Sequence, residues 1–448
     1  MARAEIRERI EVVRPINNLA KNVIIFLGDG MGISTITASR ILKGQINGQR
    51  GEEGYLEFDR FPYSALIKTY NLDRQVPDSA GTATAYLGGV KANFYTVGVN
   101  GRVSKDEPDC KLIQDSHVSS VLLWAQESGK GSGFVTTTRI THATPAASYA
   151  HTQNRDWEAN IPKAGGDKGL LKNIEFCKDI ASQLIDSKPG SDLNVVLGGG
   201  RTNFLPRRTF DPKGTLYQGK IVPVEGKRND GRNLINEWKN IHKNIDPEKY
   251  SYVNNTKGLR NINYTKTKYL FGLFNHTNME YESLRDKGSD GEPSLTEMVE
   301  AAIKVLSNHD NGFVLLVEAG RIDHAHHDGY SNLALQETVE LNRAVRRARE
   351  LTSMEETLIL VTADHSHSLT INGYPKRGNP ISGFGGSDDF GTPYTTLMYA
   401  NGPGHRDDNG LILLTSEDTN YVKFRPHSGI RIKETNHGGE DVGKFFKI

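Results

Sequence analysis

The sequence predicts an α/β protein built on a doubly wound, mostly parallel sheet. Short runs of apolar, β-branched residues recur along the chain, stretches with helical periodicity lie between them, and no internal repeat is visible. Runs this apolar are typical of central parallel strands that are buried on both faces. Their alternation with helices favours a doubly wound sheet.

Five runs have the composition of such strands. They span residues 21–30, 133–143, 193–200, 311–320 and 357–367. The helical patterns between them include 115–129 and 295–309. Residues 373–430 differ, because they are rich in Gly, Pro, Asp and Asn and contain only short strand-like pieces such as "YTTLMYA". We interpret this segment as an irregular inserted subdomain.

The bulk composition fits a globular chain without a nucleic-acid partner. Hydrophobic residues make up 36% of the 448 residues, and 55 Lys and Arg oppose 54 Asp and Glu. A net charge of +1 gives no electrostatic reason to expect nucleic-acid binding. No apolar run approaches the roughly 18 residues of a membrane-spanning helix. The charged N-terminus lacks the apolar region of a signal peptide.

Two cysteines, Cys110 and Cys177, are too few for a Cys-rich zinc module, so a metal here would use His and carboxylate ligands. The residues alone leave one disulfide or two buried thiols open, and they favour thiols. Three N-x-S/T sequons, at Asn254, Asn263 and Asn275, are glycosylation candidates. Their clustering favours a secreted chain, whereas the N-terminus shows no export signal.

The stretch "VPDSAGTATAYLGG", residues 76–89, is poor in large side chains. Asp78 and Ser79 precede its run of Ala, Gly and Thr. Both are ordinary N-cap residues, so the stretch by itself predicts a helix that Ser79 caps. The alternative is that Ser79 is a nucleophile at a helix N-terminus.

Carboxylate, imidazole and hydroxyl groups follow four of the expected strands. They are Asp29 after the first strand, His142 and Thr144 after the second, Glu318, Asp323, His324, His326 and His327 after the fourth, and Asp364, His365 and His367 after the fifth. Ligands of open α/β sheets bind at the carboxyl ends of the strands. Carboxylates gathered there would repel one another unless metal ions neutralised them.

The donor types indicate which metals to expect. His and carboxylate ligands without cysteine suit catalytic Zn²⁺, and Glu, Asp and Thr oxygens suit Mg²⁺. Asp323 and His327 are spaced i, i+4, so both face one metal if a helical turn follows the strand.

Seven motifs together resemble the animal type of the metal-dependent alkaline phosphatases. They are "NVIIFLGDGMGISTITASRILKGQ", "PDSAGTATAYLGGVKAN", "TTTRITHATPAASYAHTQNRDW", "VLGGGRTNF", "LLVEAGRIDHAHHDG", "VTADHSHSLTINGYPKRG" and "ETNHGGEDV". They span residues 21–442 in the family order. The resemblance implies an αβα sandwich around a mostly parallel central sheet, with a small crown-like insertion at about 373–430, and a homodimer.

The resemblance also implies a role for each matching residue. Ser79 is similar to the family's nucleophile, which forms a phosphoserine, and Arg155 to the arginine that grips the phosphate. The ligand sets would be Asp323, His327 and His437 for one zinc, Asp29, Asp364, His365 and Ser79 for the second, and Asp29, Thr144 and Glu318 for magnesium.

Further residues match the family outside the ligand sets. Asp78, His142 and His324 would support the ligands without binding metal. Cys110 and Cys177 match a family disulfide, which reverses the preference for thiols. Thr144 stands where animal members usually have Ser and offers the same hydroxyl.

The implied activity is hydrolysis of phosphate monoesters at alkaline pH. One alternative is a phosphodiesterase or sulfatase-like hydrolase of the same fold, against which Thr144, Glu318 and Arg155 argue. The other is a truncated homologue that binds metal or phosphate with weak catalysis or none. The resemblance implies small-molecule substrates and no specific nucleic-acid partner.

The chain departs from the family pattern at its ends and at a peripheral site. About 20 residues precede the first strand and 11 follow His437, which predicts a shortened isoform or an incomplete gene model. The family is extracellular or cell-surface and often lipid-anchored, but without a signal peptide or anchor tail an intracellular form is also open. Asn275 rather than Glu follows Phe274, and Lys213 stands near another expected acid. We therefore expect a peripheral calcium site that is weak or missing, with Asp290 its most plausible surviving ligand.

Overall fold

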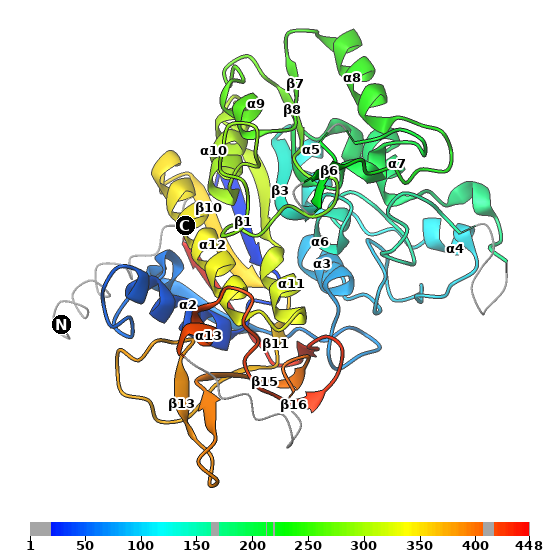
Figure 1. The fold of residues 1–448 in the computed structure, drawn as a ribbon. Helices are drawn as coiled ribbons and strands as arrows, with labels where there is room; N and C mark the ends of the chain where they lie inside the picture. The colour runs from blue at the N-terminus through cyan, green and yellow to red at the C-terminus, as the bar shows by residue number, and fades with distance from the viewer. Residues whose placement is uncertain (1–18, 163–169, 212, 218–219, 406–415, 448) are drawn as a thin grey trace. The chain divides into compact units, whose positions relative to one another are not determined.

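The computed structural model describes residues 19–162, 170–211, 213–217, 220–405 and 416–447 (Figure 1). The chain divides into two compact units: Met1–Lys68 with Ala319–Ile448 is unit 1, and Thr69–Glu318 is unit 2. Each unit contributes strands to a mostly parallel central sheet, and helices and small extra sheets make up the rest. The α/β class expected from the sequence is confirmed.

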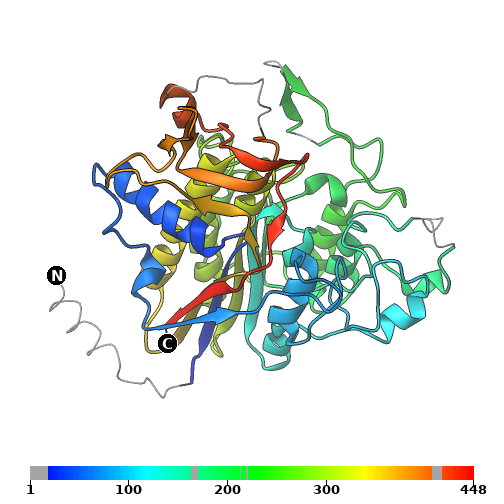
Figure 2. The same cartoon turned by 90° about the horizontal axis from the view of Figure 1, so that it is seen from below.

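Among the described residues, unit 1 contributes four strands to this sheet, in the order β2-β18-β10-β1. Their bounds are Tyr63–Ile67 (β2), Val442–Lys447 (β18), Thr357–Ala363 (β10) and Asn22–Gly28 (β1). β1 and β10 are parallel, with Gly28 opposite Ala363 at their ends. The residues that follow these two strands therefore start at the same edge. β18 is antiparallel to both β10 and β2, beside which it lies in Figure 2.

The helices in the described residues of unit 1 are α2 (Ile33–Ile46), η1 (Glu57–Arg60, a 3-10 helix), α11 (Arg321–His327), α12 (Ser331–Leu351) and α13 (Ser416–Asn420). α12 packs against α2 and β1. It buries an apolar face that includes Leu333, Leu341 and Val345. Each such side chain contributes about 1.5–3 kcal/mol of burial free energy, which fixes α12 on the strands.

Small sheets complete the described part of unit 1. β11 (Ser366–His367) pairs with β17 (His437–Gly438), β15 (Leu397–Gly402) lies between β12 (Leu369–Ile371) and β16 (Ser428–Arg431), and β13 (Phe384–Ser387) pairs with β14 (Pro393–Thr395). The segment 373–430 supplies β13, β14, β15, α13 and all of β16 except its last residue. Its status as a separate inserted subdomain stays a prediction.

Unit 2 contributes five described strands, all parallel, in the order β9-β3-β4-β8-β7. Their bounds are Phe313–Ala319 (β9, whose last residue belongs to unit 1), Gly131–Arg139 (β3), Val195–Gly199 (β4), Tyr269–Leu273 (β8) and Tyr250–Val253 (β7). β9 and β4 are buried along their whole length, as their continuous apolar runs predict. A separate hairpin pairs β5 (Thr215–Tyr217) with β6 (Lys220–Val222).

The helices of unit 2 are α3 (Ser79–Gly88), α4 (Cys110–Gln114), α5 (Val121–Glu127), α6 (Ala143–Ala146), α7 (Ile180–Asp186), α8 (Leu234–Ile245), α9 (Thr256–Arg260) and α10 (Leu295–Leu306), with 3-10 helices η2 (Ile174–Phe176), η3 (Gly190–Asp192) and η4 (Arg201–Phe204). α10 begins where expected because Ser294 and Glu297 form a reciprocal capping box.

The prediction of a helix over 115–129 is wrong for residues 115–120. Only Val121–Glu127 is helical, and Ser120 caps it by accepting from Leu123 N–H. The preceding residues are held differently, because His117 pairs as a β-bridge with Val99. A distant pairing partner therefore overrides the local helical pattern.

Cys110, the first residue of α4, forms a disulfide with Cys177. The preference for two thiols drawn from the residues alone is wrong, and the pairing implied by the family resemblance is confirmed. No helix in the described ranges combines the length and the apolar character needed to cross a bilayer.

Candidate active site

Two parallel strands of unit 1 end in candidate metal ligands. Asp29 follows β1, and Asp364 and His365 follow β10; all three are at most 3% exposed. Gly30 has φ of 69°, and its N–H donates to Asp364 Oδ1 at 3.0 Å. A Cβ at Gly30 would lie 2.7 Å from the His367 ring. Glycine therefore permits the tight turn that brings the two carboxylates together.

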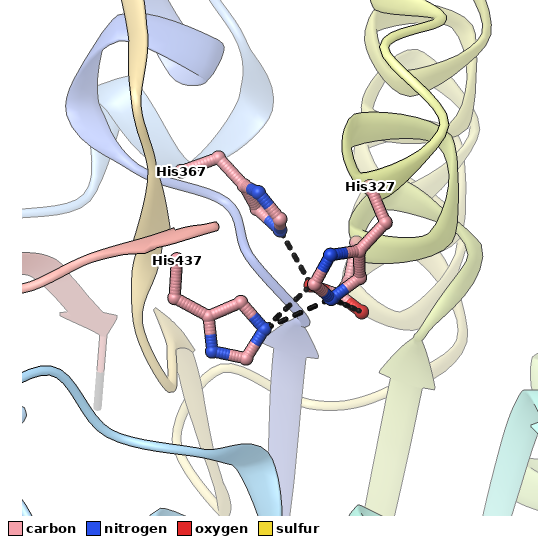
Figure 3. Close-up of side chains that lie close together, drawn as sticks. His327, His367 and His437 are labelled. Atoms are coloured by element: carbon pink, nitrogen blue, oxygen red, sulfur yellow. Dashed lines mark hydrogen bonds and ion pairs between the residues drawn. The ribbon is translucent and has the colours of Figure 1, made fainter. Parts of the chain in front are cut away.

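One cluster of unit 1 places four metal-binding side chains close together. Their ligand atoms lie within 4.8 Å of one another, and Figure 3 shows the three labelled rings converging. The four residues are Asp323, His327, His367 and His437. Asp323 and His327 lie one turn apart on α11, as their spacing predicts. β17 pairs with β11, which sets His437 opposite His367.

The distances in this cluster suit a shared cation. His327 Nε2 and His437 Nε2 are 3.0 Å apart, and each lies 3.4 Å from a carboxylate oxygen of Asp323. A second group joins Asp29, Asp323 and His365, with His365 Nε2 3.4 Å from Asp29 Oδ1. Imidazole nitrogens and carboxylate oxygens gathered this closely are the donors that zinc prefers.

Backbone carbonyls fix which ring nitrogen faces these clusters. His327 Nδ1 lies 2.7 Å from the Thr435 carbonyl oxygen, and His365 Nδ1 lies 3.1 Å from that of Ser366. A carbonyl oxygen only accepts, so each Nδ1 carries the proton and donates it. In the neutral ring Nε2 is then unprotonated, which is the form that ligates a metal.

Burial favours neutral imidazoles in unit 1. It lowers the pKa of His365 to about 4 and the pKa of His367 well below its ordinary value. Burial raises the pKa of Asp323, but the neighbouring histidines outweigh this and hold that pKa well below its usual range. With Asp29 and Asp364, three buried carboxyl groups face these rings. Such a set needs a compensating cation, so the residues fit bound metal ions.

In unit 2, Asp78 caps helix α3 and Ser79 is the first helical residue. Asp78 accepts hydrogen bonds from the N–H groups of Ala80 and Gly81, both at 3.2 Å. The local prediction that Ser79 is the cap is therefore wrong by one residue, because the carboxylate of Asp78 reaches both N–H groups. Ser79 is 1% exposed at the positive end of the helix, a position that favours an anion.

The Arg155 guanidinium is oriented by two partners. Its Nη1 donates to Asp78 Oδ2 at 3.1 Å, and its Nη2 lies 3.0 Å from His142 Nε2. Because a guanidinium only donates, His142 Nε2 is the acceptor. Asp78 thus fixes the start of α3 and Arg155 at once, so Ser79 and Arg155 share one framework.

Glu318 and Thr144 are candidate oxygen ligands in unit 2. Glu318 Oε2 accepts from the hydroxyls of Thr136 and, at 3.1 Å, Thr138 on β3. Thr144 is fully buried in α6, and its Oγ1 has no hydrogen-bond partner among the residues that the structure describes. An unsatisfied buried hydroxyl costs about 1–3 kcal/mol. Thr144 Oγ1 therefore fits a ligand of a hard cation such as Mg²⁺.

His324, on α11, differs from the zinc-type histidines. Its Nδ1 lies 3.2 Å from Arg321 Nη1. Since the arginine donates, Nδ1 accepts and the proton of the neutral ring sits on Nε2. This tautomer suits a hydrogen-bond donor rather than a metal ligand through Nε2.

His367 and Thr435 take part in the site although neither belongs to a ligand set that the family resemblance implies; the sequence places His367 after the fifth expected strand and gives Thr435 no role. His367 Nε2 contacts Asp323 Oδ1 at 2.5 Å, and Thr435 Oγ1 lies 3.4 Å from His367 Nδ1. The alternation His365, Ser366, His367 is a signal for two rings on one side of a strand. Thr435 has no such signal, because its partners are far away in the sequence.

The sequence profile of the alkaline phosphatases matches residues 20–447. The chain belongs to the alkaline phosphatase family. It is 47% identical over 439 residues to the alkaline phosphatase of Gadus morhua, which covers 96% of this chain and 87% of that protein. It is 45% identical over 448 residues to the tissue-nonspecific alkaline phosphatase isozyme of Gallus gallus, and the match covers 99% of this chain and 83% of that protein. By this homology the chain is an enzyme.

Other relatives extend the comparison. The membrane-bound alkaline phosphatase of Bombyx mori is 43% identical over 432 residues, covering 95% of this chain and 75% of that protein. Solved alkaline phosphatases share the fold. The Thermus thermophilus enzyme has a TM-score of 0.63 at 20% identity and covers 100% of this chain and 90% of its own. The enzyme of the Antarctic bacterium TAB5 has a TM-score of 0.61 at 20% identity, and the match covers 95% of this chain and 90% of that enzyme.

The unsatisfied hydroxyl of Thr144 predicts how metal-free protein responds to Thr144→Val. After chelation, the variant is expected to unfold at the wild-type temperature or above it, because valine keeps the shape and removes the unpaired group. Added Mg²⁺ is expected to raise the Tm of wild type but not of the variant. Differential scanning calorimetry measures both effects.

The matched control is Thr84→Val, which removes a buried hydroxyl that bonds the Ala80 carbonyl and Gly98 N–H. This variant is expected to lose stability with and without Mg²⁺, while keeping the Mg²⁺ response. A Thr144→Val protein less stable than wild type in the absence of metal contradicts the assignment.

Proposed function

We propose that this alkaline phosphatase hydrolyses phosphate monoesters to an alcohol and inorganic phosphate at alkaline pH, through a phosphoserine on Ser79. The observation that carries the proposal is the convergence in unit 1 of imidazole nitrogens and buried carboxylates, in a member of this family. Family membership supports the carry-over of the roles implied by the matching motifs.

Ser79 is the proposed nucleophile. Its oxygen bonds to phosphorus as the ester P–O bond breaks, and the alcohol leaves with a proton. Water then cleaves the phosphoserine and releases phosphate. The first turn of α3 supports the anionic phosphoryl group, because the positive end of the helix dipole favours negative charge.

Arg155 is the proposed phosphate clamp. A guanidinium binds two phosphate oxygens in a planar fork, provided its orientation is fixed. Asp78 and His142 supply this orientation, each from a different terminal nitrogen of Arg155.

Two Zn²⁺ and one Mg²⁺ are the cofactors we propose. The ligand sets are Asp323, His327 and His437 for one zinc, Asp29, Asp364, His365 and Ser79 for the other, and Asp29, Thr144 and Glu318 for magnesium. When bound, such ions neutralise the phosphate charge and lower the pKa of coordinated hydroxyl groups and water. The neutral tautomers and the unsatisfied hydroxyl of Thr144 support these sets.

The substitution Ser79→Ala tests the mechanism. It is expected to lower kcat for p-nitrophenyl phosphate by at least about 10³-fold, because no other group on α3 replaces the nucleophile. Spectrophotometric assays with titrated zinc and magnesium measure the rate. Ser120→Ala removes another buried serine, the cap of α5, and is expected to cost about 1 kcal/mol of stability but no activity.

Three outcomes contradict the proposal. Full activity in Ser79→Ala excludes the phosphoserine. A wild-type enzyme that cleaves a diester or sulfate ester faster than a monoester indicates the related hydrolases. Stoichiometric zinc without turnover indicates a binding homologue.

We also propose a homodimer at the cell surface or outside the cell, acting on small-molecule monoesters. The family resemblance supports both features, and the relative from Bombyx mori is membrane-bound.

Asn263 is the sequon we propose to be glycosylated. Asn263 and Thr265 are both exposed, with the Thr265 hydroxyl donating to Asn263 Oδ1 at 2.9 Å. Asn275 Nδ2, where a glycan would attach, donates to Glu292 Oε1 at 2.5 Å. The third sequon, at Asn254, is only half-exposed.

Secreted protein is therefore expected to carry a glycan on Asn263 and none on Asn275. Mass spectrometry of peptides after enzymatic deglycosylation locates the sites. Asn263→Gln is expected to remove one glycan from the intact mass, and Asn275→Gln to remove none. A glycan on Asn275 in active protein contradicts the assignment.

We propose that stability does not depend on calcium at the peripheral site. Lys213 Nζ donates to the Asp290 carbonyl at 3.0 Å. Burial lowers the pKa of this ammonium, and the nearby Glu292 and Asp211 carboxyl groups oppose that shift only in part. A lysine ammonium in this place supplies the positive charge that a calcium ion would bring.

Millimolar Ca²⁺ is accordingly expected to change the Tm of wild type by less than about 1 °C. Lys213→Met keeps an unbranched side chain that is one heavy atom shorter, removes the charge and is expected to lower the Tm by roughly 1–3 °C. Thermal unfolding followed by circular dichroism measures both. A clear rise in wild-type Tm with Ca²⁺, absent with Mg²⁺, contradicts this proposal.

A further inference from the structure

Tyr95 adopts a backbone conformation that disfavours its side chain. Its φ is 73°, and the other non-glycine residues with positive φ in the described ranges are Asn173 and Arg208. A bulky residue in the left-handed region is strained, and such strain persists only where the surroundings hold it. Tyr95 lies in unit 2, in the loop that follows α3.

The main chain of Tyr95 connects two groups of the proposed site. Its N–H donates to Asp78 Oδ1 at 2.9 Å, and its carbonyl accepts from Arg155 N–H at 3.0 Å. The backbone conformation of Tyr95 thus lets its N–H bond the residue that caps α3, and its carbonyl bond the segment that carries Arg155. Glycine would meet this backbone requirement without strain.

The Tyr95 ring contacts two cations. Arg155 Cζ lies 5.6 Å from the ring centroid, and Lys105 Nζ lies 3.8 Å from it. Both distances are within the range of a cation–π interaction. Asp78 and His142 hold the two terminal nitrogens of Arg155, so the ring adds a third contact to the same guanidinium.

We propose that Tyr95 is a positioning residue whose aromatic ring holds the Arg155 guanidinium in the orientation that binds phosphate. The ring explains why a strained tyrosine stands where glycine would satisfy the main chain. Lys105 packs on the same ring and restrains its orientation. This inference rests on the proposed function in one respect, that Arg155 binds the phosphate group.

The test is Tyr95→Gly, which keeps both main-chain hydrogen bonds and removes only the ring. Its Tm is expected to stay within about 3 °C of wild type, because relief of strain offsets the lost contacts and the flexibility of glycine. The Ki of inorganic phosphate, as a competitive inhibitor, and the KM of p-nitrophenyl phosphate are expected to rise about three- to tenfold. kcat is expected to change less than KM.

Tyr95→Phe keeps the ring and is expected to restore the wild-type Ki. In the Arg155→Ala background, Tyr95→Gly is expected to have no further effect on Ki, because the ring acts through the guanidinium. Tyr95→Leu keeps the strain without an aromatic face and is expected to lower the Tm and raise Ki.

An active Tyr95→Gly enzyme with the wild-type Ki overturns the inference. So does a parallel loss of Tm and kcat at unchanged Ki, which indicates a structural role only. An undiminished effect of Tyr95→Gly in the Arg155→Ala background shows that the ring does not act through Arg155. If wild type neither binds phosphate nor hydrolyses monoesters, the proposed function fails, and this inference fails with it.

Discussion

The structure of unit 1 depends on the cost of burying carboxyl groups at the ends of parallel strands. β1 and β10 are in register and end at the same level, so Asp29 and Asp364 enter a region with almost no solvent. Isolated charges cannot be buried there without a partner. Three features bring the carboxylates and imidazoles together so that they can share a cation. They are a glycine turn at Gly30, a helix with Asp323 and His327 on one face, and a short strand pair that contains His437.

In unit 2, hydrogen bonds compensate for the burial of a carboxylate. The Asp78 carboxylate accepts from five donors, which come from α3, the loops on either side of it and Arg155; they are Asn71 Nδ2, Ala80 N, Gly81 N, Tyr95 N and Arg155 Nη1. Charge-assisted bonds of this kind are stronger than neutral ones. One carboxylate therefore positions the proposed nucleophile and the proposed phosphate clamp together, before any substrate arrives.

Much of the site could be predicted from the sequence, because ligands at strand ends follow from local patterns. The apolar runs place Asp29, Asp364 and His365 directly after strands, and the i, i+4 spacing places Asp323 and His327 on one helical face. The predictions that failed depend on distant partners or on a choice between neighbours. The helix predicted over 115–129 does not include residues 115–120, because His117 forms a β-bridge with Val99. Asp78 rather than Ser79 caps α3.

The sequence by itself determined the chemistry, since it holds the hydroxyl, imidazole and carboxylate groups and the family motifs that order them. The tertiary structure decided which ring nitrogen faces the ligand cluster, through the carbonyls of Thr435 and Ser366. It also decided that Tyr95 accepts a strained conformation beside Arg155. The physical reason is range: helix and strand patterns reflect interactions between near neighbours. Tautomers, caps and strained turns are fixed by contacts that exist only after remote segments have packed.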